Sequence, residues 1–387
     1  MNNATVNAGS IALNETPMYV ACKYGHTEIV SILLKHNANR IDINEGKLDE
    51  TPLHIACKKG HTNIVSLLLK HGANTIDINQ ADTRKDKTPF FYACKRGHTQ
   101  IVSLLLKHDA DEVDMYHDTY KQETPLYAAC KGGYTDIVIL LLTRETKVIN
   151  KSRYDGASPL WVACRKGHVE VVSTLLDQCG IEKDKCMLTG MSPLFIATLL
   201  GHTQIAEILL RRQADVNLCI ENTDKVTRVF ERYRNDYMDQ IRDTCLYTKK
   251  YKLNLECFIK YISKLVRENA SRDVNTYIDG KEDNWVAHLM FGALPLHIGS
   301  VMGHTDIVTL LAGRTAIINC LTENGSTPLF LACEFGHDDV VRLLLENGAN
   351  PNFERKDGKS PLSIAKENSH LNIIEIIKKH TVQLLTS

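Results

Sequence analysis

Apolar and polar positions follow a pattern that returns along the whole chain, and residues 51–79 carry it most clearly. Thr51 and Pro52 predict a helix start, because a threonine hydroxyl caps free backbone N–H groups and proline lacks an N–H that would be unbonded there. Gly60 predicts the end of this short helix, since glycine readily adopts the left-handed conformation. The apolar positions between them are Leu53, Ile55, Ala56 and Cys57.

A second helix is predicted to begin at Thr62, whose hydroxyl is a suitable cap. Positive charge in its last turn, at Lys70 and His71, suits the helix dipole, and Gly72 ends it. The alternation over residues 76–79 then predicts a short extended finger. The apolar residues at helical spacing in this second helix are Ile64, Val65, Leu68 and Leu69.

This unit of two helices and a finger opens nine times. Intervals of 33 to 37 residues separate the starts, except for one interval of 102 residues. Because isolated helices of roughly ten residues are marginal in water, each unit needs neighbours to cover its apolar faces. The starts are Thr16, Thr51, Thr88, Thr124, Ser158, Ser192, Leu294, Thr327 and Ser360.

The motif within each unit is T-P-L-H-x-A followed by G-H, with a period near 33 residues. With this motif the chain closely resembles the ankyrin-repeat family. The resemblance implies an all-α solenoid, a stack of helix–turn–helix units with β-hairpin fingers that project at right angles. It also implies that the last two residues of each first helix face a concave groove where partners bind.

The interval of 102 residues leaves residues 219–290 without the motif. Helices are expected near 226–242 and 255–269, the second followed by a finger, and 280–284 is expected to be a loop. Because 102 is three times 34, the alternative we favour is one or two degenerate repeats, and the other is a helical insertion that bulges from the stack. The flanking parts are a polar N-terminal lead over 1–15, six repeats over 16–218, and three repeats with a C-terminal cap over 291–387.

Composition narrows the class of function. The 387 residues carry 46 basic and 46 acidic side chains, so net charge favours neither nucleic acid nor membrane. No apolar run reaches the length of a membrane span, and the first residues do not resemble a secretory signal. Twelve cysteines at these spacings indicate reduced thiols. We expect a monomeric cytoplasmic protein, with a nuclear location as the alternative.

Histidine and cysteine recur at fixed positions of the unit. The histidines are expected to form hydrogen bonds between repeats rather than bind zinc, because helices of successive layers lie roughly 8–10 Å apart. The cysteines follow a small alanine and are expected to be buried fillers. The two sets are His26, His61, His98, His168, His202, His304, His337 and His370, and Cys22, Cys57, Cys94, Cys130, Cys164 and Cys333.

Other candidate sites are weaker. Cys179 and Cys186 lie across one finger, but two ligands are too few for a metal site. An acidic run lacks the glycine and terminal glutamate of a calcium loop, so we expect a solvated finger there. No phosphate-binding loop, nucleophile elbow or H-E-x-x-H motif is present, so no enzyme activity, cofactor or metal is predicted. The acidic run is Asp109, Asp111, Glu112, Asp114 and Asp118.

The groove positions implied by the resemblance form two contrasting sets. In the first five repeats they are mostly basic, namely Lys23, Tyr24, Lys58, Lys59, Lys95, Arg96, Lys131, Gly132, Arg165 and Lys166. In later repeats they are mostly apolar, namely Leu199, Leu200, Val301, Met302, Glu334 and Phe335. We expect a row of solvent-facing cations that leads to an exposed apolar anchor. The alternative is that copied lysines only keep a surface soluble.

These observations predict a non-catalytic scaffold or adaptor that binds a partner protein, with an acidic segment, on its concave face. Cations there would speed and orient the encounter. Recognition of nucleic acid or anionic lipid headgroups by the same row is an alternative, with nucleic acid less expected. A further alternative is a non-catalytic subunit of an enzyme complex. A salt titration separates these ligands, since nucleic acid binding falls most steeply with salt.

Overall fold

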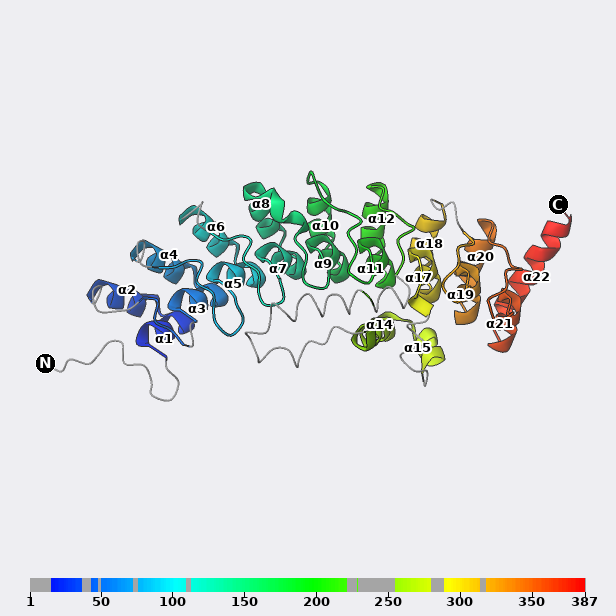
Figure 1. Ribbon diagram of the computed structural model, residues 1–387, viewed down its shortest axis with the longest axis horizontal. Coiled ribbons are helices and arrows are strands. Elements are labelled where there is room, and N and C mark those ends of the chain that lie inside the picture. Colours follow the sequence, from blue (N-terminus) through cyan, green and yellow to red (C-terminus); the bar gives the residue numbers. More distant parts are fainter. Residues whose placement is uncertain are drawn as a thin grey trace. The chain divides into compact units, whose positions relative to one another are not determined.

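The computed structural model describes residues 15–36, 43–47, 50–71, 76–108, 113–220, 228, 255–279, 289–313 and 318–386. Over these residues the chain forms pairs of short helices joined by turns (Figure 1). The chain divides into two compact units, unit 1 over Met1–Ile181 and unit 2 over Glu182–Ser387.

Unit 1 is a stack of five helix pairs. The first helix of each pair, called inner here, contacts the inner helices of adjacent pairs, and the second, called outer, contacts adjacent outer helices (Figure 1). A short 3-10 helix, η1 (Thr146–Asn150), follows the fourth pair. The inner helices are α1 (Pro17–Tyr24), α3 (Pro52–Lys59), α5 (Pro89–Arg96), α7 (Pro125–Gly132) and α9 (Pro159–Lys166). The outer helices are α2 (Thr27–His36), α4 (Thr62–His71), α6 (Thr99–His108), α8 (Thr135–Arg144) and α10 (Val169–Leu176).

Unit 2 repeats this arrangement, and its described residues include four helix pairs and the further helices α14 (Leu255–Asn269) and α15 (Arg272–Ile278). Its inner helices are α11 (Pro193–Leu199), α17 (Pro295–Met302), α19 (Pro328–Phe335) and α21 (Pro361–Glu367). Its outer helices are α12 (Thr203–Arg211), α18 (Thr305–Ala312), α20 (Asp338–Glu346) and α22 (Leu371–Thr386). Of the further helices, α15 contacts α19.

The inner helices begin and end where the sequence predicts. The Thr51 hydroxyl accepts a hydrogen bond from the His54 N–H (3.3 Å), and the Thr88 hydroxyl accepts one from the Phe91 N–H (3.1 Å). At the other end of α3, Gly60 has a φ of 85°, in the left-handed region that glycine adopts without strain. The predicted caps are therefore confirmed in these repeats.

Stacking covers the apolar residues of each pair. Ile64 and Leu68 of α4 are both fully buried between neighbouring repeats. Ile29, at the position of Ile64 in the first pair, is 47% exposed. Burial of this position thus depends on the preceding repeat, as expected for a stack whose core is formed between units.

The connection before each inner helix ends in a tight turn. In unit 2, the Thr322 N–H donates to the Ser326 carbonyl (3.0 Å), and the Gly325 N–H donates to the Thr322 carbonyl (2.9 Å). No strand forms among the described residues, where one isolated β-bridge joins Lys47 and Glu50. The all-α repeat stack is confirmed, whereas the β-hairpin form of the fingers is not.

Two distant parts of the sequence complete one of these turns. The Ile220 N–H donates to the Ala293 carbonyl (3.4 Å), and the Gly292 N–H donates to the Ile220 carbonyl (3.0 Å). Ile220 thus takes the place that Thr322 has in the next repeat. In addition, α11 contacts α17 and α12 contacts α18. We infer that the chain between Ile220 and Leu289 is an insertion within one finger, the second of the two alternatives.

The inserted segment contains a helix where one was expected, over 255–269. The finger expected after it is wrong, because residues 272–278 form α15 and the Ser271 hydroxyl accepts a capping hydrogen bond from the Val274 N–H (3.3 Å). The helix expected near 226–242, the loop expected at 280–284 and the lead over 1–15 lie outside the described residues, apart from Arg228 and Glu15.

Candidate functional site

A contact between neighbouring repeats fixes the ends of the inner helices. The ring of His98 lies against Gly60 of the preceding repeat so closely that a Cβ atom there would come within 2.6 Å of it. The His168 Nε2 hydrogen-bonds to the Lys131 carbonyl oxygen (3.2 Å), and the His337 Nε2 to that of Val301 (2.8 Å). The predicted inter-repeat hydrogen bonding by these histidines is confirmed, and it positions the candidate groove residues.

The last two residues of each inner helix in unit 1 form two rows of different exposure. The paired row consists of Lys23, Lys58, Lys95, Lys131 and Arg165, all half-buried. The exposed row consists of Tyr24, Lys59, Arg96, Gly132 and Lys166, all exposed. The cations of the exposed row thus face solvent, whereas those of the paired row are only partly exposed.

Three of the five cations in the paired row, Lys23, Lys58 and Lys131, form ion pairs with glutamates of the chain. The Nζ atoms of three lysines lie close to a carboxylate oxygen, in Lys23–Glu15 (3.0 Å), Lys58–Glu50 (2.6 Å) and Lys131–Glu123 (2.9 Å). Burial raises the pKa of Glu50, but hydrogen bonds from Lys58 and Tyr19 outweigh this and hold that pKa below its ordinary value. Much of the charge of this row is therefore neutralised within the chain.

The glutamates of these pairs were missed from the sequence, although a signal for them is present. Each directly precedes a capping threonine, in the triplet E-T-P at residues 15–17, 50–52 and 123–125, and each lysine follows eight residues later. An eight-residue spacing spans the whole inner helix, so it is not one of the usual helical neighbours. Only the folded repeat brings the two ends together.

Aromatic rings lie beneath the same row. The Lys58 Nζ is 5.1 Å from the ring centroid of Tyr92, and the Arg165 guanidinium carbon is 5.9 Å from that of Trp161. A cation within about 6 Å of a ring is attracted by its negative face. These contacts order the side chains and direct them along the face of the inner helices.

The exposed row is interrupted at Gly132. In this repeat Tyr134 replaces the usual histidine, and its ring lies over both Gly97 and Gly132. A Cβ atom at residue 132 would come within 2.3 Å of the Tyr134 ring. A basic residue is thus excluded at this position by the neighbouring tyrosine.

The predicted apolar anchor in unit 2 is not exposed. Leu199 is fully buried, Val301, Met302 and Phe335 are at most 4% exposed, and Leu200 is half-buried. One reason is the inserted segment, since α15 contacts α19 and the Tyr277 ring lies edge-on to that of Phe335 at a centroid distance of 5.1 Å. The expectation of an exposed apolar patch is therefore wrong for the structure described here.

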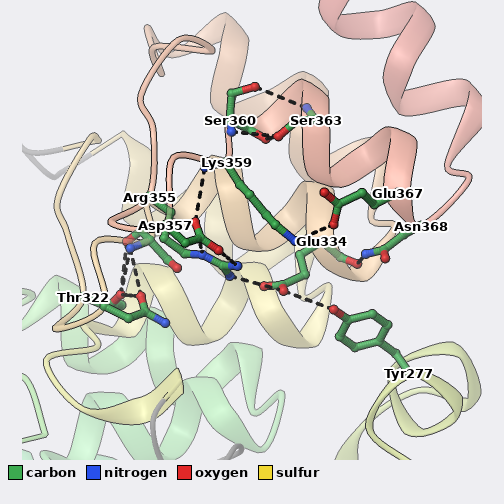
Figure 2. A network of polar contacts seen from close by, with 12 residues as sticks. Tyr277, Thr322, Glu334, Arg355, Asp357, Lys359, Ser360, Ser363, Glu367 and Asn368 are labelled. Carbon is green, nitrogen blue, oxygen red and sulfur yellow. Dashed lines mark hydrogen bonds and ion pairs between the residues drawn. The ribbon is translucent and has the colours of Figure 1, made fainter.

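Glu334, the acidic member of that set, has a buried carboxylate that contacts Tyr277 and Arg355 (Figure 2). It accepts a hydrogen bond from the Tyr277 hydroxyl (3.1 Å) and pairs with Arg355 Nη1 (3.4 Å). Burial, with a further contribution from Glu334, raises the pKa of Tyr277 to about 12. The backbone carbonyl of Glu334 accepts a hydrogen bond from the Asn368 side chain (2.8 Å). This network joins the insertion to the last repeats.

The repeated cysteines are buried free thiols, which confirms their predicted role as fillers. Burial raises the pKa of Cys22 to about 12, so the nucleophilic thiolate is not formed at neutral pH. The Cys320 Sγ lies 3.7 Å from His297 Nε2. However, burial raises the pKa of Cys320 to about 12 and lowers that of His297 to about 4, so both groups are neutral rather than an activated pair.

The other candidate ligands do not converge. Within the described ranges, no group of three or more His, Cys, Asp or Glu side chains is placed to hold a metal ion. Asp114 instead accepts a backbone hydrogen bond from Tyr116 (2.8 Å), and Asp118 pairs with Lys151 (3.3 Å). Cys179 and Cys186 are not joined by a disulfide, and the Cys186 thiol donates a hydrogen bond to the Asp184 carbonyl (3.4 Å). Asp109, Asp111 and Glu112 lie outside the described residues.

In the part of the chain that the structure describes, no helix has both the length and the apolar character needed to cross a membrane. Stacked helix pairs with a repeated Gly–His contact define a helical repeat protein. A family model that describes three consecutive ankyrin repeats matches residues 2–82, 74–152, 144–220, 254–355 and 296–386. The chain therefore belongs to the ankyrin-repeat family, whose repeats are generally protein-interaction modules. A comparison with curated proteins finds no match.

Proposed function

We propose that this protein is a non-catalytic scaffold that binds an acidic segment of a partner protein along the inner helices of unit 1. The observation that supports the proposal is the exposed row, in which Lys59, Arg96 and Lys166 project from equal positions of stacked helices. In the adjacent paired row, Lys23, Lys58 and Lys131 are already paired with glutamates of the chain, so the exposed row supplies most of the accessible charge. Tyr24, 62% exposed, adds an aromatic contact at the first repeat.

Binding would rely on rigid presentation. Adjacent inner helices lie roughly 8–10 Å apart, so the row offers cations at regular steps to an extended chain. Each exposed ion pair contributes only about 0–1 kcal/mol, so affinity would come from several pairs together. Long-range attraction would raise the association rate more than it slows dissociation.

The proposal is confined to unit 1, because the apolar groove positions of unit 2 are buried. The fingers would form a projecting rim beside the row, and the protein would act as a monomer in the cytoplasm. Buried free thiols such as Cys57 and Cys94 support a reducing compartment.

The experiment uses the triple variant Lys59→Glu, Arg96→Glu, Lys166→Glu of the full chain. Proteins captured from cells by the unaltered chain are identified, and association with the captured partner is measured against salt. We expect association at least about tenfold slower and a flatter salt dependence, because steering by these charges is lost. The paired-row lysines stay unchanged, since glutamate there would oppose Glu15, Glu50 or Glu123.

The control is Lys70→Glu, Lys107→Glu, Lys147→Glu, which changes net charge equally at exposed residues outside the exposed row. It should leave association unchanged apart from the general effect of net charge. If both triple variants bind the partner equally well, the exposed row only solubilises the surface. If RNA or phosphatidylserine vesicles bind more tightly than the protein partner, with a steeper salt dependence, the proposal is wrong about the class of ligand.

A further inference from the structure

The third repeat departs from the ion-pair pattern of its neighbours. The residue before the capping threonine is glutamate in the repeats of α1, α3 and α7, but it is Lys87 in the repeat of α5. Eight residues later, Lys95 occupies the paired row as usual. Two lysines therefore lie where the adjacent repeats place a lysine and a glutamate.

Lys87 and Lys95 extend over one aromatic ring. The Lys87 Nζ lies 5.3 Å from the ring centroid of Phe91, and the Lys95 Nζ lies 5.9 Å from it. Lys87 is also 5.9 Å from the ring centroid of Tyr92. The rings hold both ammonium groups in place without neutralising them. Among the described residues, no carboxylate oxygen lies within 4.0 Å of either Nζ atom.

The neighbouring carboxylates have other partners. Glu123 pairs with Lys131 (2.9 Å) and Arg153 (3.7 Å). Asp82, on the same finger as Lys87, accepts a hydrogen bond from the Tyr92 hydroxyl (2.7 Å). The chain itself thus leaves the third repeat without the carboxylate that the second and fourth repeats possess.

We infer that Lys87 and Lys95 together form an open acceptor for one carboxylate of the partner protein. The incoming carboxylate would make with Lys95 the kind of ion pair that Glu50 makes with Lys58 and Glu123 makes with Lys131. The inference rests on the proposed function and adds a register to it, because one acidic residue of the partner would dock at the third repeat. Its neighbours along the segment would then reach Lys59 and Arg96.

The ionisation of Lys87 agrees with an unfilled site. Burial, followed by the charge of Lys95, lowers the pKa of Lys87 to about 8, while Glu123 opposes the shift and Lys85 adds to it. A carboxylate beside the ammonium group favours the charged form and would raise this pKa. Binding near pH 8 should therefore take up protons.

The test measures the side-chain ammonium resonances of the full chain by NMR during titration with a capped hexaglutamate peptide. We expect the Lys87 and Lys95 signals to shift and the titration midpoint of Lys87 to rise. The variant Lys87→Glu would create with Lys95 the pair seen between Glu50 and Lys58, and it should lose at least about tenfold in affinity, as expected for a charge-assisted contact. The control Lys85→Glu makes the same charge change on the same finger, at an exposed residue.

The outcomes separate this inference from the proposed function. Shifts at Lys59 without shifts at Lys87 and Lys95, or equal losses in the two variants, overturn the acceptor and leave the proposed function standing. If no lysine signal shifts during the titration, both the acceptor and the proposed function are wrong. Tighter binding of inorganic phosphate than of the peptide at Lys87 overturns the choice of a carboxylate. If Lys87→Glu does not fold, Lys87→Met removes the charge alone and should still weaken peptide binding more than Lys85→Met.

Discussion

Two buried histidines of the chain act as neutral hydrogen-bonding groups. The ring of His297 is fully buried, its Nδ1 accepts from the Leu294 N–H (3.1 Å), and its Nε2 therefore carries the proton and donates to the Cys320 carbonyl (3.0 Å). His54 makes the same contacts, with the Thr51 N–H (3.1 Å) and the Lys87 carbonyl (3.1 Å). Each ring thus ties the start of an inner helix to the finger that follows.

This burial predicts a specific acid sensitivity. Burial lowers the pKa of His297 to about 4, so between pH 6.5 and 4 the unfolded chain binds a proton that the folded chain does not. The contribution of His297 to the free energy of unfolding is therefore fully present above pH 6.5. It falls as the pH drops through this window, by about 3 kcal/mol at most. The variant His297→Phe should have a free energy of unfolding about 1 kcal/mol lower at pH 7, and its thermal unfolding should depend less on pH.

Phenylalanine is a suitable replacement because it occupies the same position in other repeats, at Phe91, Phe195 and Phe330. The control is His26→Phe, at an exposed histidine of the first repeat, and it should leave the pH profile unchanged. An unchanged profile in His297→Phe would show that this ring does not control the acid response.

At the scale of the element, the sequence predicts helices well because their ends are locally encoded. The Thr-Pro start and the glycine end of α3 act within a few residues, and the observed Pro52–Lys59 agrees with them. Local resemblance misled at 271–275, where Ser271 caps a helix rather than opening a finger. The ion pairs between Glu50 and Lys58 need both ends of a folded repeat, so helical periodicity alone does not reveal them.

The candidate groove was harder to predict, because exposure depends on segments distant in sequence. Val301 and Phe335 occupy positions that the repeat directs toward the groove, yet both are buried. The cover on Phe335 includes Tyr277, which belongs to the insertion and follows no repeat rule. Likewise, the position of Lys58 in the repeat assigns it to the groove. That position does not predict that Lys58 is half-buried against Glu50 and Tyr92.

A substitution in one outer helix should loosen mainly its neighbours. Leu68 of α4 is fully buried, so Leu68→Ala should lower the free energy of unfolding by about 2–5 kcal/mol. Since repeats contact only adjacent repeats, amide hydrogen exchange should quicken first in α2, α4 and α6. The matched control is Leu67→Ala, one residue earlier and half-buried, with a smaller expected effect. Equal loosening of α20 and α22 would contradict local coupling.

At the scale of the molecule, the stack of unit 2 continues past the insertion without a missing layer. The ring of His304 covers Gly201, the same contact that His337 makes with Gly303 in the next repeat. The turns agree as well, since the Glu323 N–H donates to the Phe291 carbonyl (3.1 Å), as the Lys356 N–H does to that of Asn324 (3.4 Å). The ring contact, the turn hydrogen bonds and the helix contacts α11–α17 and α12–α18 are thus all made by residues on either side of the insertion.

The insertion should therefore be removable. Deleting residues 221–289 joins Ile220 to Met290 and restores the spacing of the turn from Thr322 to Ser326, with Gly292 in the left-handed position of Gly325. We expect α11 and α17 to keep their slow hydrogen exchange, because their contact does not involve the deleted residues. Loss of α15 should uncover the ring of Phe335, so an apolar dye such as anilinonaphthalene sulfonate should bind the shortened chain more strongly.

A longer deletion provides the control. Removing residues 221–292 takes away three more residues, among them Gly292, whose N–H closes the turn on the Ile220 carbonyl. This chain should lose the register between α11 and α17 and melt at a clearly lower temperature than the first deletion. If the two deletions unfold unit 2 alike, the inserted segment is part of the stack's own structure. If the first deletion folds but binds no more dye than the full chain, α15 is not what covers the apolar face of α19.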